Sequence, residues 1–410
     1  MEKKKPQIRF NGFEEEWVTT TLGDIAVRVV SKNDDNGVIL PLTISAQYGL
    51  ISQTEFFNSR IAAKDVRGYY VIKKGEFAYN RSTSEFSPFG AVKRLDRYDA
   101  GVLSTLYIVF RLSSEQIQSN YLVNYFSTSN WHQYIAENAA EGARNHGLLN
   151  ITAEDFLKTP IKAPIVPEEQ KKIASFLTTL DKLIAKLEAK LDKLRKLKQA
   201  LLEKMFINVN GGGYKAPQIR FKGYTDKWQV KELGEVAIFN PPNQPLRERF
   251  YYIDLESVEK GSLKVKEQVT KRMAPSRAQR TLEFNDILFQ TVRPYLQNHY
   301  LFKKKTQNNQ WVASTGYALL RPKIYPELLY TMLLSKGFMQ EIMQRCTGST
   351  YPAINSKKMI DIKVGCSSVQ MEQQLIGDLF ILLDDQLNKT STKLTKLRNI
   401  KQSLLQKMFA

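Results

Sequence analysis

The stretch PQIRFNGFEEEW at residues 6–17 decides the fold, because it returns as PQIRFKGYTDKW at residues 217–228. Shortly after it, LGDIA at residues 22–26 returns as LGEVA at residues 233–237. Both matches have the same offset of 211 residues, from position 6 to position 217. A repeat at a fixed offset indicates that the chain contains one structural unit twice.

A second pair of matching segments closes each half of the chain. LRKLKQALLEKMF at residues 194–206 returns as LRNIKQSLLQKMF at residues 397–409, an offset of 203. Further upstream, four more residues return at this offset: Glu169, Gln170, Ile173 and Asp181 as Glu372, Gln373, Ile376 and Asp384. The offsets differ by eight residues, and no convincing match lies between the repeated blocks. Each half therefore has a shared leader, a private middle and a shared tail.

The shared tails are predicted to be long helices. Between Pro167 and Phe206 there is no glycine, and proline occurs only at the start. Apolar residues recur at helical spacing in both tails: Leu177, Leu180, Ile184, Leu187, Leu191, Leu194, Leu201 and Met205, then Phe380, Leu383, Leu387, Leu394, Leu397, Leu404 and Met408. Lys198 and Lys401 interrupt these stripes, and we expect their ammonium groups to reach solvent. Each helix of roughly 58 Å must bury its stripe, and the other helix is the obvious partner.

The private middles are predicted to be compact α+β domains. Strand-like runs rich in β-branched and aromatic residues occur at 68–72, 76–79, 106–110 and 287–292. Amphipathic helices are expected at 119–137 and 326–346. A glycine hinge at 211–213 separates the two halves.

The composition favours a polyanionic partner. The 410 residues include 60 Lys and Arg against 41 Asp and Glu, which gives a net charge of +19. Two cysteines, Cys346 and Cys366, and three histidines argue against a disulfide framework or a zinc site. The sequence has no signal peptide and no apolar run of membrane-spanning length, so we expect a cytoplasmic protein that does not contact a membrane.

Three segments resemble specificity subunits of type I restriction-modification systems. They are the leader at residues 6–24, the PIVPEEQKKI junction at 164–173 and the LRKLKQALLEKMF tail at 194–206, and the leader and the tail occur twice. The resemblance implies two target-recognition domains separated by two long helices that form an antiparallel coiled coil, with a pseudo-two-fold internal repeat. The expected boundaries are 1–166 for the first target-recognition domain, 167–208 for the central helical spacer, 209–369 for the second domain and 370–410 for the C-terminal helical spacer.

The resemblance also implies a function. Such a subunit recognises an asymmetric bipartite site in double-stranded DNA and directs adenine-N6 methylation and restriction by partner subunits. The expected partners are two methyltransferase subunits and restriction-translocase subunits. S-adenosylmethionine, ATP and magnesium belong to those partners, so this chain is expected to have no cofactor, no metal and no catalytic residue of its own.

Candidate DNA-contacting residues lie on polar loops that follow predicted strands. Base contacts are predicted for Asn80, Arg81, Ser82, Thr83, Ser84, Arg144, Asn145, His146, Gln290, Thr291, Arg293, Tyr295, Gln297, Asn298, Thr350 and Tyr351. Among these, Arg81 has the chemistry to pair with guanine and Asn80 with adenine. Phosphate contacts are predicted for Lys93, Arg94, Arg272, Arg277 and Arg280. For each residue the alternative is an ordinary solvated surface position.

Two other functions compete with DNA recognition. Asn240-Pro-Pro-Asn243 is similar to the Asn-Pro-Pro-aromatic motif of amino-methyltransferases, but Asn243 lacks the aromatic face and no glycine-rich cofactor loop precedes it. A coiled-coil scaffold that binds only protein is the other alternative. The leader aromatics, including Trp17 and Trp228, are expected in the core rather than stacked on bases.

Overall fold

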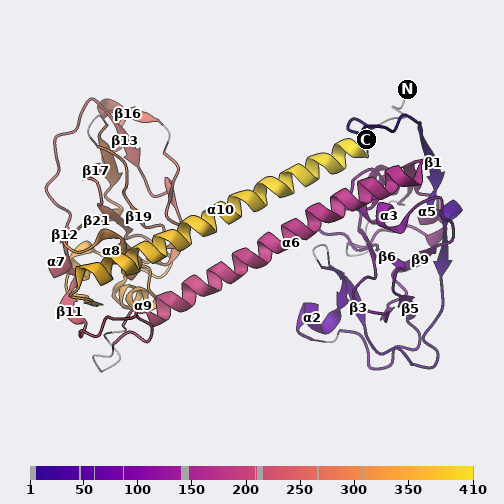
Figure 1. The fold of residues 1–410 in the computed structure, drawn as a ribbon, viewed down its shortest axis with the longest axis horizontal. Coiled ribbons are helices and arrows are strands. Elements are labelled where there is room, and N and C mark those ends of the chain that lie inside the picture. Colours follow the sequence, from indigo (N-terminus) through magenta and orange to yellow (C-terminus); the bar gives the residue numbers. More distant parts are fainter. Residues whose placement is uncertain are drawn as a thin grey trace. The chain divides into compact units, whose positions relative to one another are not determined.

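A computed structural model describes residues 6–45, 48–59, 61–85, 87–139, 147–207, 209, 216–265, 267–306 and 309–409. The chain divides into two compact units. The first contains Met1–Lys186 and Lys393–Ala410, and the second contains Leu187–Thr392. Figure 1 labels the helices and strands of both units.

The globular part of the first unit combines small antiparallel sheets with short helices. Its main sheet has the strand order β2-β9-β6-β7, and the smaller pairs are β1-β10, β3-β4 and β5-β8. Its elements are β1 (Trp17–Thr21), α1 (Leu22–Ile25), β2 (Ala26–Val29), β3 (Leu42–Ser45), β4 (Gly49–Ser52), α2 (Gln53–Phe57), β5 (Tyr70–Lys73), β6 (Phe77–Asn80), β7 (Ala91–Arg94), β8 (Ala100–Leu103), β9 (Ile108–Leu112), α3 (Ser119–Tyr125), α4 (His132–Asn138), α5 (Ala153–Leu157) and β10 (Pro160–Pro164).

The globular part of the second unit has two four-stranded sheets, with the orders β12-β21-β18-β19 and β16-β13-β20-β17, and the smaller pairs β11-β22 and β14-β15. Its elements are β11 (Gln229–Glu232), α7 (Leu233–Val236), β12 (Ala237–Phe239), β13 (Arg249–Ile253), β14 (Val258–Glu259), β15 (Ser262–Leu263), β16 (Gln268–Thr270), η2 (Lys271–Met273), β17 (Ala278–Thr281), β18 (Ile287–Gln290), η3 (Pro294–Leu296), β19 (Tyr300–Leu301), β20 (Trp311–Ser314), β21 (Tyr317–Pro322), α8 (Pro326–Leu333), α9 (Lys336–Arg345), η4 (Ser356–Met359) and β22 (Lys363–Cys366).

The private middles share a sheet topology that their sequences do not reveal. In the first unit β6 lies between β9 and β7, and in the second unit β18 lies between β21 and β19, with every pairing antiparallel. Two helices follow the last strand of this sheet in each unit, α3 and α4 in one and α8 and α9 in the other. The two middles therefore repeat the same arrangement of strands and helices, although their sequences do not match.

Each of the two predicted amphipathic helices is broken into two. In the first unit the Thr128 hydroxyl donates to the carbonyl of Tyr125 and accepts from the backbone N–H of Asn130, between α3 and α4. In the second unit Ser335 caps the start of α9 by accepting from the N–H of Phe338. Ser and Thr side chains that bond to nearby backbone compete with helix hydrogen bonds, which explains both breaks.

The two long helices are α6 (Pro167–Lys204) and α10 (Gln370–Met408), and each contributes a segment to both units. In the first unit Ile173 and Leu177 of α6 share a core with Met408 of α10. In the second unit Phe206 lies just beyond α6 and contacts Phe380 of α10 at a ring distance of 5.9 Å. The α+β fold with two long paired helices predicted from the sequence is confirmed.

Ion pairs form at the two lysine positions that interrupt the apolar stripes. Lys198 contacts Asp384 in the second unit, and Lys401 contacts Asp181 in the first, each at 2.5 Å. We expected these ammonium groups to reach solvent, but each instead pairs with an aspartate on the other long helix. Because 198 and 401 share the offset of Asp181 and Asp384, the two pairs are copies of one interaction.

The repeated leader is tied to the start of a long helix. The guanidinium of Arg9 donates two hydrogen bonds, 2.7 and 2.8 Å long, to the buried carboxylate of Glu169 at the start of α6. Arg220 binds Glu372 at the start of α10 in the same bidentate way. Burial alone raises the pKa of Glu372, but hydrogen bonds from Arg220 and Ser367 outweigh it and hold the pKa below its ordinary value. The arginine of the PQIRF leader is therefore an anchor.

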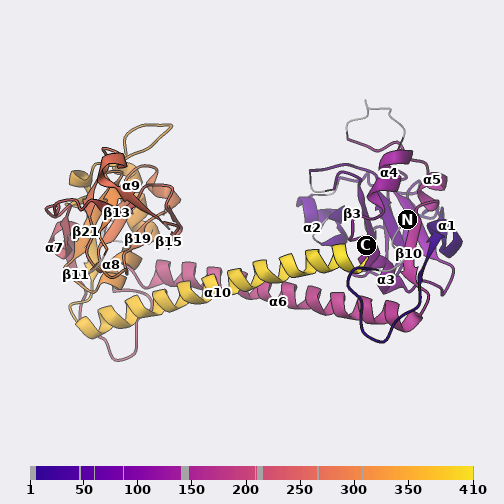
Figure 2. The same ribbon diagram turned by 90° about the horizontal axis from the view of Figure 1, so that it is seen from above.

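A buried phenylalanine follows the C-terminal end of each long helix. Phe409, which is fully buried, packs against Trp17 and Tyr121 of the first unit, and Figure 2 shows the end of α10 beside α3. Phe206 packs against Trp228 in the second unit in the same manner. Both leader tryptophans lie in the core, as the sequence predicted. Among the described residues, no helix combines the length and apolar character needed to cross a membrane.

Candidate DNA interface

The predicted loop of the first unit leaves the end of β6 and pairs with a second loop. The N–H and the hydroxyl of Thr83 both donate to the carbonyl of Gly147, and the N–H of Leu149 donates to the carbonyl of Arg81. The side-chain oxygen of Asn80 accepts from the N–H of Ser82. These bonds fix the loop and leave Ser82 and Ser84 exposed. The predicted residues Arg144, Asn145 and His146 lie outside the described residues.

The Arg81 side chain supports the loop. Its Nε donates to the carbonyl of Leu106 at 3.0 Å, and its Nη1 donates to the carbonyl of Ile151 at 3.1 Å. Two of the donors that would contact a guanine are thus engaged with backbone carbonyls of the same unit. The geometry is that of a positioning residue.

The second unit builds its loop in the same way. Val292, which follows β18, forms a bridge with Ala353, and Ala353 pairs with Thr347. The N–H of Arg293 donates to the carbonyl of Pro352 at 2.7 Å. The loop after the central strand thus pairs with a loop that follows the second helix, as in the first unit. The structure therefore brings the 290–293 and 350–351 predictions together.

Gln290 and Thr291 lie beneath the surface of this loop. Gln290 is 4 % exposed, its N–H donates to Nδ1 of His299, and its side-chain amide donates to the carbonyl of Val292. The Thr291 hydroxyl donates to the carbonyl of Gly316. Burial lowers the pKa of His299 to about 3, so the imidazole is neutral and accepts at Nδ1. The hydrogen bonds of Gln290 and Thr291 therefore fix the conformation of the loop.

The surface of the loop carries aromatic and guanidinium groups. Arg293 has a left-handed backbone with φ of 52°, and its guanidinium lies 4.1 Å from the centre of the Tyr351 ring. Tyr295 is half exposed and Thr350 is exposed. Gln297 and Asn298 instead make hydrogen bonds within the unit. The side-chain amide of Gln297 donates to the carbonyl of Leu334, and the side-chain oxygen of Asn298 accepts from the N–H of Lys260.

The predicted phosphate contacts fall into two groups. Arg272 and Arg277 are exposed, whereas Arg280 is half-buried in β17. In the first unit Arg94 donates to Asp96 and to the hydroxyl of Ser119. Lys93 is half-buried on β7, where burial and the neighbouring Lys401 lower its pKa.

The methyltransferase-like motif is structural. The side-chain oxygen of Asn240 accepts from the N–H of Leu319, and its amide donates to the hydroxyl of Ser356. The side-chain oxygen of Asn243 accepts from the N–H of Thr281. Both side chains are therefore used to fasten the turn between β12 and β13. Among the described residues, no three acidic, histidine or cysteine side chains gather as metal ligands.

The chain also matches known proteins. Residues 14–196 match the family model described as type I restriction modification DNA specificity domain. The matched segment comprises the loop-bearing part of the first unit and most of α6.

One curated relative and one solved structure are also similar to this chain. A putative type I restriction enzyme specificity subunit of Methanocaldococcus jannaschii is 31% identical over 121 residues, which are 29% of this chain and 26% of that relative. The match thus spans about a quarter of the curated relative. The crystal structure of a type I restriction-modification S subunit from M. genitalium superposes with a TM-score of 0.63 at 17% identity, covering 99% of both chains. The chain therefore has the fold of that S subunit.

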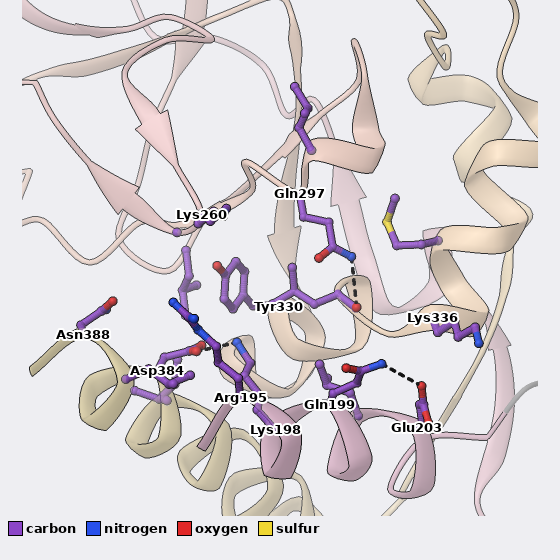
Figure 3. Close-up of a pocket in the computed structure, with 18 of the residues that line it drawn as sticks. Arg195, Lys198, Gln199, Glu203, Lys260, Gln297, Tyr330, Lys336, Asp384 and Asn388 are labelled. Carbon is purple, nitrogen blue, oxygen red and sulfur yellow. Dashed lines mark hydrogen bonds and ion pairs between the residues drawn. The ribbon is translucent and has the colours of Figure 1, made fainter. Parts of the chain in front are cut away.

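Each unit has a groove where its globular part meets the long helices. In the second unit a groove of about 680 Å³ is lined by Lys198 and Leu202 of α6, Asp384 of α10, and Tyr330 and Met339 of the globular part. Figure 3 shows Arg195, Lys198 and Asp384 along its helical floor, with Lys260 and Gln297 on the opposite wall. Its lining is both apolar and basic.

The first unit has the matching groove. It measures about 730 Å³ and is lined by Asp181 and Ile184 of α6, Lys401 and Leu405 of α10, and Trp131 of the globular part. Residue for residue, Asp181, Arg398, Lys401, Gln402 and Leu405 repeat Asp384, Arg195, Lys198, Gln199 and Leu202. The two grooves therefore present nearly the same helical surface.

Sequence analysis missed the three repeated contacts that build the units: the Arg9–Glu169 type, the Lys198–Asp384 type and the Phe409 plug. Apart from Tyr121, the residues in them belong to repeated blocks, so the two offsets were the available signal. The sequence does not show which copy of one repeated block contacts which copy of another.

Proposed function

We propose that this chain is the DNA-specificity subunit of a type I restriction-modification complex, without a catalytic centre of its own. It recognises an asymmetric bipartite site and directs adenine-N6 methylation and restriction by its partners. The observation that carries the proposal is the specificity domain at residues 14–196, joined to a second unit that repeats its sheet order and its paired loops.

Each target-recognition domain, 1–166 and 209–369, is proposed to recognise one half-site. We propose that Ser82, Ser84, Tyr295 and Tyr351, which are exposed on the loops, meet base edges together with Arg293. The buried or engaged residues, among them Arg81 and Gln290, position those loops. Because the loops of the two units differ in sequence, the two half-sites differ as well. The spacers at 167–208 and 370–410 set the gap between them.

The basic side chains supply affinity that does not depend on sequence. Arg272 and Arg277 are exposed on the second unit and suit phosphate contacts. Lys93, Arg94 and Arg280 are less accessible and would contribute mainly through their charge. Each phosphate contact releases counterions, so binding should weaken steeply as the salt concentration rises.

The two matching grooves support two copies of the same partner. We propose that one methyltransferase subunit docks at each groove, over the repeated positions Lys198–Asp384 and Lys401–Asp181. Restriction-translocase subunits complete the complex. S-adenosylmethionine, ATP and magnesium are bound by these partners, and the assembly acts on double-stranded DNA in the cytoplasm.

The test is a map of N6-methyladenine. The chain is expressed with its methyltransferase partner in a host without adenine methylation, and methylated positions are found by long-read sequencing. We expect a split motif with a fixed gap that disappears when the chain is omitted. If a stable complex forms but methylation does not depend on the chain, the scaffold alternative is correct. If the chain methylates DNA by itself, it is a divergent methyltransferase.

A further inference from the structure

Arg293 stands in a conformation that costs free energy. Its backbone has φ of 52° and ψ of 56°, a left-handed region that residues other than glycine and asparagine seldom occupy. The conformation is held on both sides, because the N–H donates to Pro352 and the next residue is Pro294, which begins η3. Such strain persists only where the surroundings enforce it, and it is common at functional sites.

The strained backbone places the Arg293 guanidinium on an exposed aromatic ring. It lies 4.1 Å from the ring centre of Tyr351, whose side chain is 60 % exposed. Among the described residues, the guanidinium has no hydrogen-bond acceptor and no carboxylate partner. Stacking restrains the plane of the guanidinium while its edge, with the N–H donors, remains available.

We propose that Arg293, stacked on Tyr351, recognises a guanine in the half-site of the second unit. This inference rests on the proposed function and names one base contact within it. A planar guanidinium with two free N–H donors matches the O6 and N7 acceptors of guanine in the major groove. The exposed Tyr295 and Leu296 beside it add surface that a bound duplex would cover.

A phosphate contact is the rival role for this arginine. Phosphate contacts tolerate a mobile side chain, since the oxygens accept from many directions and carry no sequence information. Arg272 is an exposed arginine on η2 of the same unit and serves as the matched comparison. The fixed backbone and the stack distinguish Arg293 from it.

The matching position of the first unit holds Thr83, whose N–H donates to the carbonyl of Gly147 as that of Arg293 donates to the carbonyl of Pro352. Arg81 is the first residue after β6, and its side chain donates to the carbonyls of Leu106 and Ile151. Guanine recognition by an arginine after the central strand is therefore specific to the second unit among the described residues.

The experiment measures binding specificity and salt dependence together. The full chain in complex with its methyltransferase partner is used to select sites from a randomised duplex library, as wild type, Arg293→Ala, Arg293→Lys, Tyr351→Leu and Arg272→Ala. We expect both Arg293 variants to lose discrimination by about 5- to 100-fold at one guanine of one half-site and to keep the other half-site. Arg293→Lys retains the charge and the backbone, so it tests the planar fork even if the alanine variant is unstable. Tyr351→Leu should weaken the same position, whereas Arg272→Ala should lower affinity for all sequences equally.

Two results separate the inference from the proposed function. A split motif unchanged in both Arg293 variants, or a uniform loss of affinity with a shallower salt dependence, overturns guanine recognition and leaves the proposed function intact. If the wild-type complex selects no motif, the proposed function itself fails.

Discussion

At the residue scale, the leader arginine and the glutamate at the helix start form a buried ion pair in each unit: Arg9 with Glu169, and Arg220 with Glu372. Glu169 and Glu372 are fully buried, and both are held by two charge-assisted hydrogen bonds. A buried carboxylate that loses its partner pays its desolvation cost without compensation. The repeated arginine of the leader therefore contributes to stability.

Glu372→Gln should lower the free energy of unfolding of the second unit at pH 7 by about 1–3 kcal/mol, because Arg220 is left without its carboxylate. The pKa of Glu372 is depressed in the folded state, so its contribution is full above the ordinary value of 4.5. The difference between wild type and variant should shrink as the pH falls below 4.5. Denaturant unfolding between pH 3 and pH 7 measures it.

The control is Glu168→Gln, an exposed glutamate next to Glu169. This variant should unfold like the wild type at every pH. A difference between Glu372→Gln and wild type that stays constant down to pH 3 would contradict the lowered pKa.

Phe409→Ala should destabilise the first unit by about 3–5 kcal/mol, since it empties a site packed by Trp17 and Tyr121. Phe206→Ala should act on the second unit for the same reason. Hydrogen exchange resolved along the chain measures each unit separately. Ile39→Ala, at a side chain that is 68 % exposed, is the control and should have little effect. Equal loss of protection in both units for Phe409→Ala would contradict this assignment.

The sequence predicts the role of a residue when that role follows from the residue's type and position. It does not predict a role that depends on a contact with a distant part of the chain. Trp17 and Trp228 were predicted to be in the core because large aromatics beside a strand are buried. The carbonyl contacts of Arg81 and the stack of Arg293 on Tyr351 depend on loops that lie far apart in sequence. No local pattern contains that information.

At the element scale, two ion pairs fix the register of the long helices. Lys198 and Asp384 are about one-fifth and one-third exposed, so their interaction is shielded more than a surface pair. The pair joins α6 to α10 within the second unit, and its copy joins them within the first. A shift of one helix by a turn would separate the charges.

Asp384→Lys should destabilise the second unit, and the exchange Lys198→Asp with Asp384→Lys should recover most of the loss. The coupling free energy from this double-mutant cycle should exceed 1 kcal/mol, on the order expected for partly buried pairs. Lys196 and Asp192 form an exposed pair within α6 and provide the control, with about 0.3–0.5 kcal/mol. Equal coupling in the two cycles would show that the pair between the helices does not set the register.

Helices and strands with a strong periodicity were predicted well, and their breaks were not. The stripe from Leu177 to Met205 predicts α6, and the run at 287–292 predicts β18. The breaks between α3 and α4 and between α8 and α9 depend on single Thr and Ser hydrogen bonds. The shared sheet order was invisible because strands of four residues accept many apolar sequences.

At the scale of the whole molecule, one chain contains two structurally repeated units with different loops. The repeated blocks build the helices, the anchors and the grooves, while the private middles keep the sheet order and vary the surface. Under the proposed function, the shared residues serve assembly and the private ones serve DNA specificity. Specificity should therefore follow a middle wherever it is placed.

The most direct test replaces residues 18–166 with a copy of residues 229–369, the segment at the matching positions of the repeat. Methylated adenines are then mapped for the altered chain with its methyltransferase partner. We predict that both half-sites become copies of the sequence that the second unit recognises, with the other half-site lost. An unchanged asymmetric motif would contradict the claim that each unit recognises its own half-site.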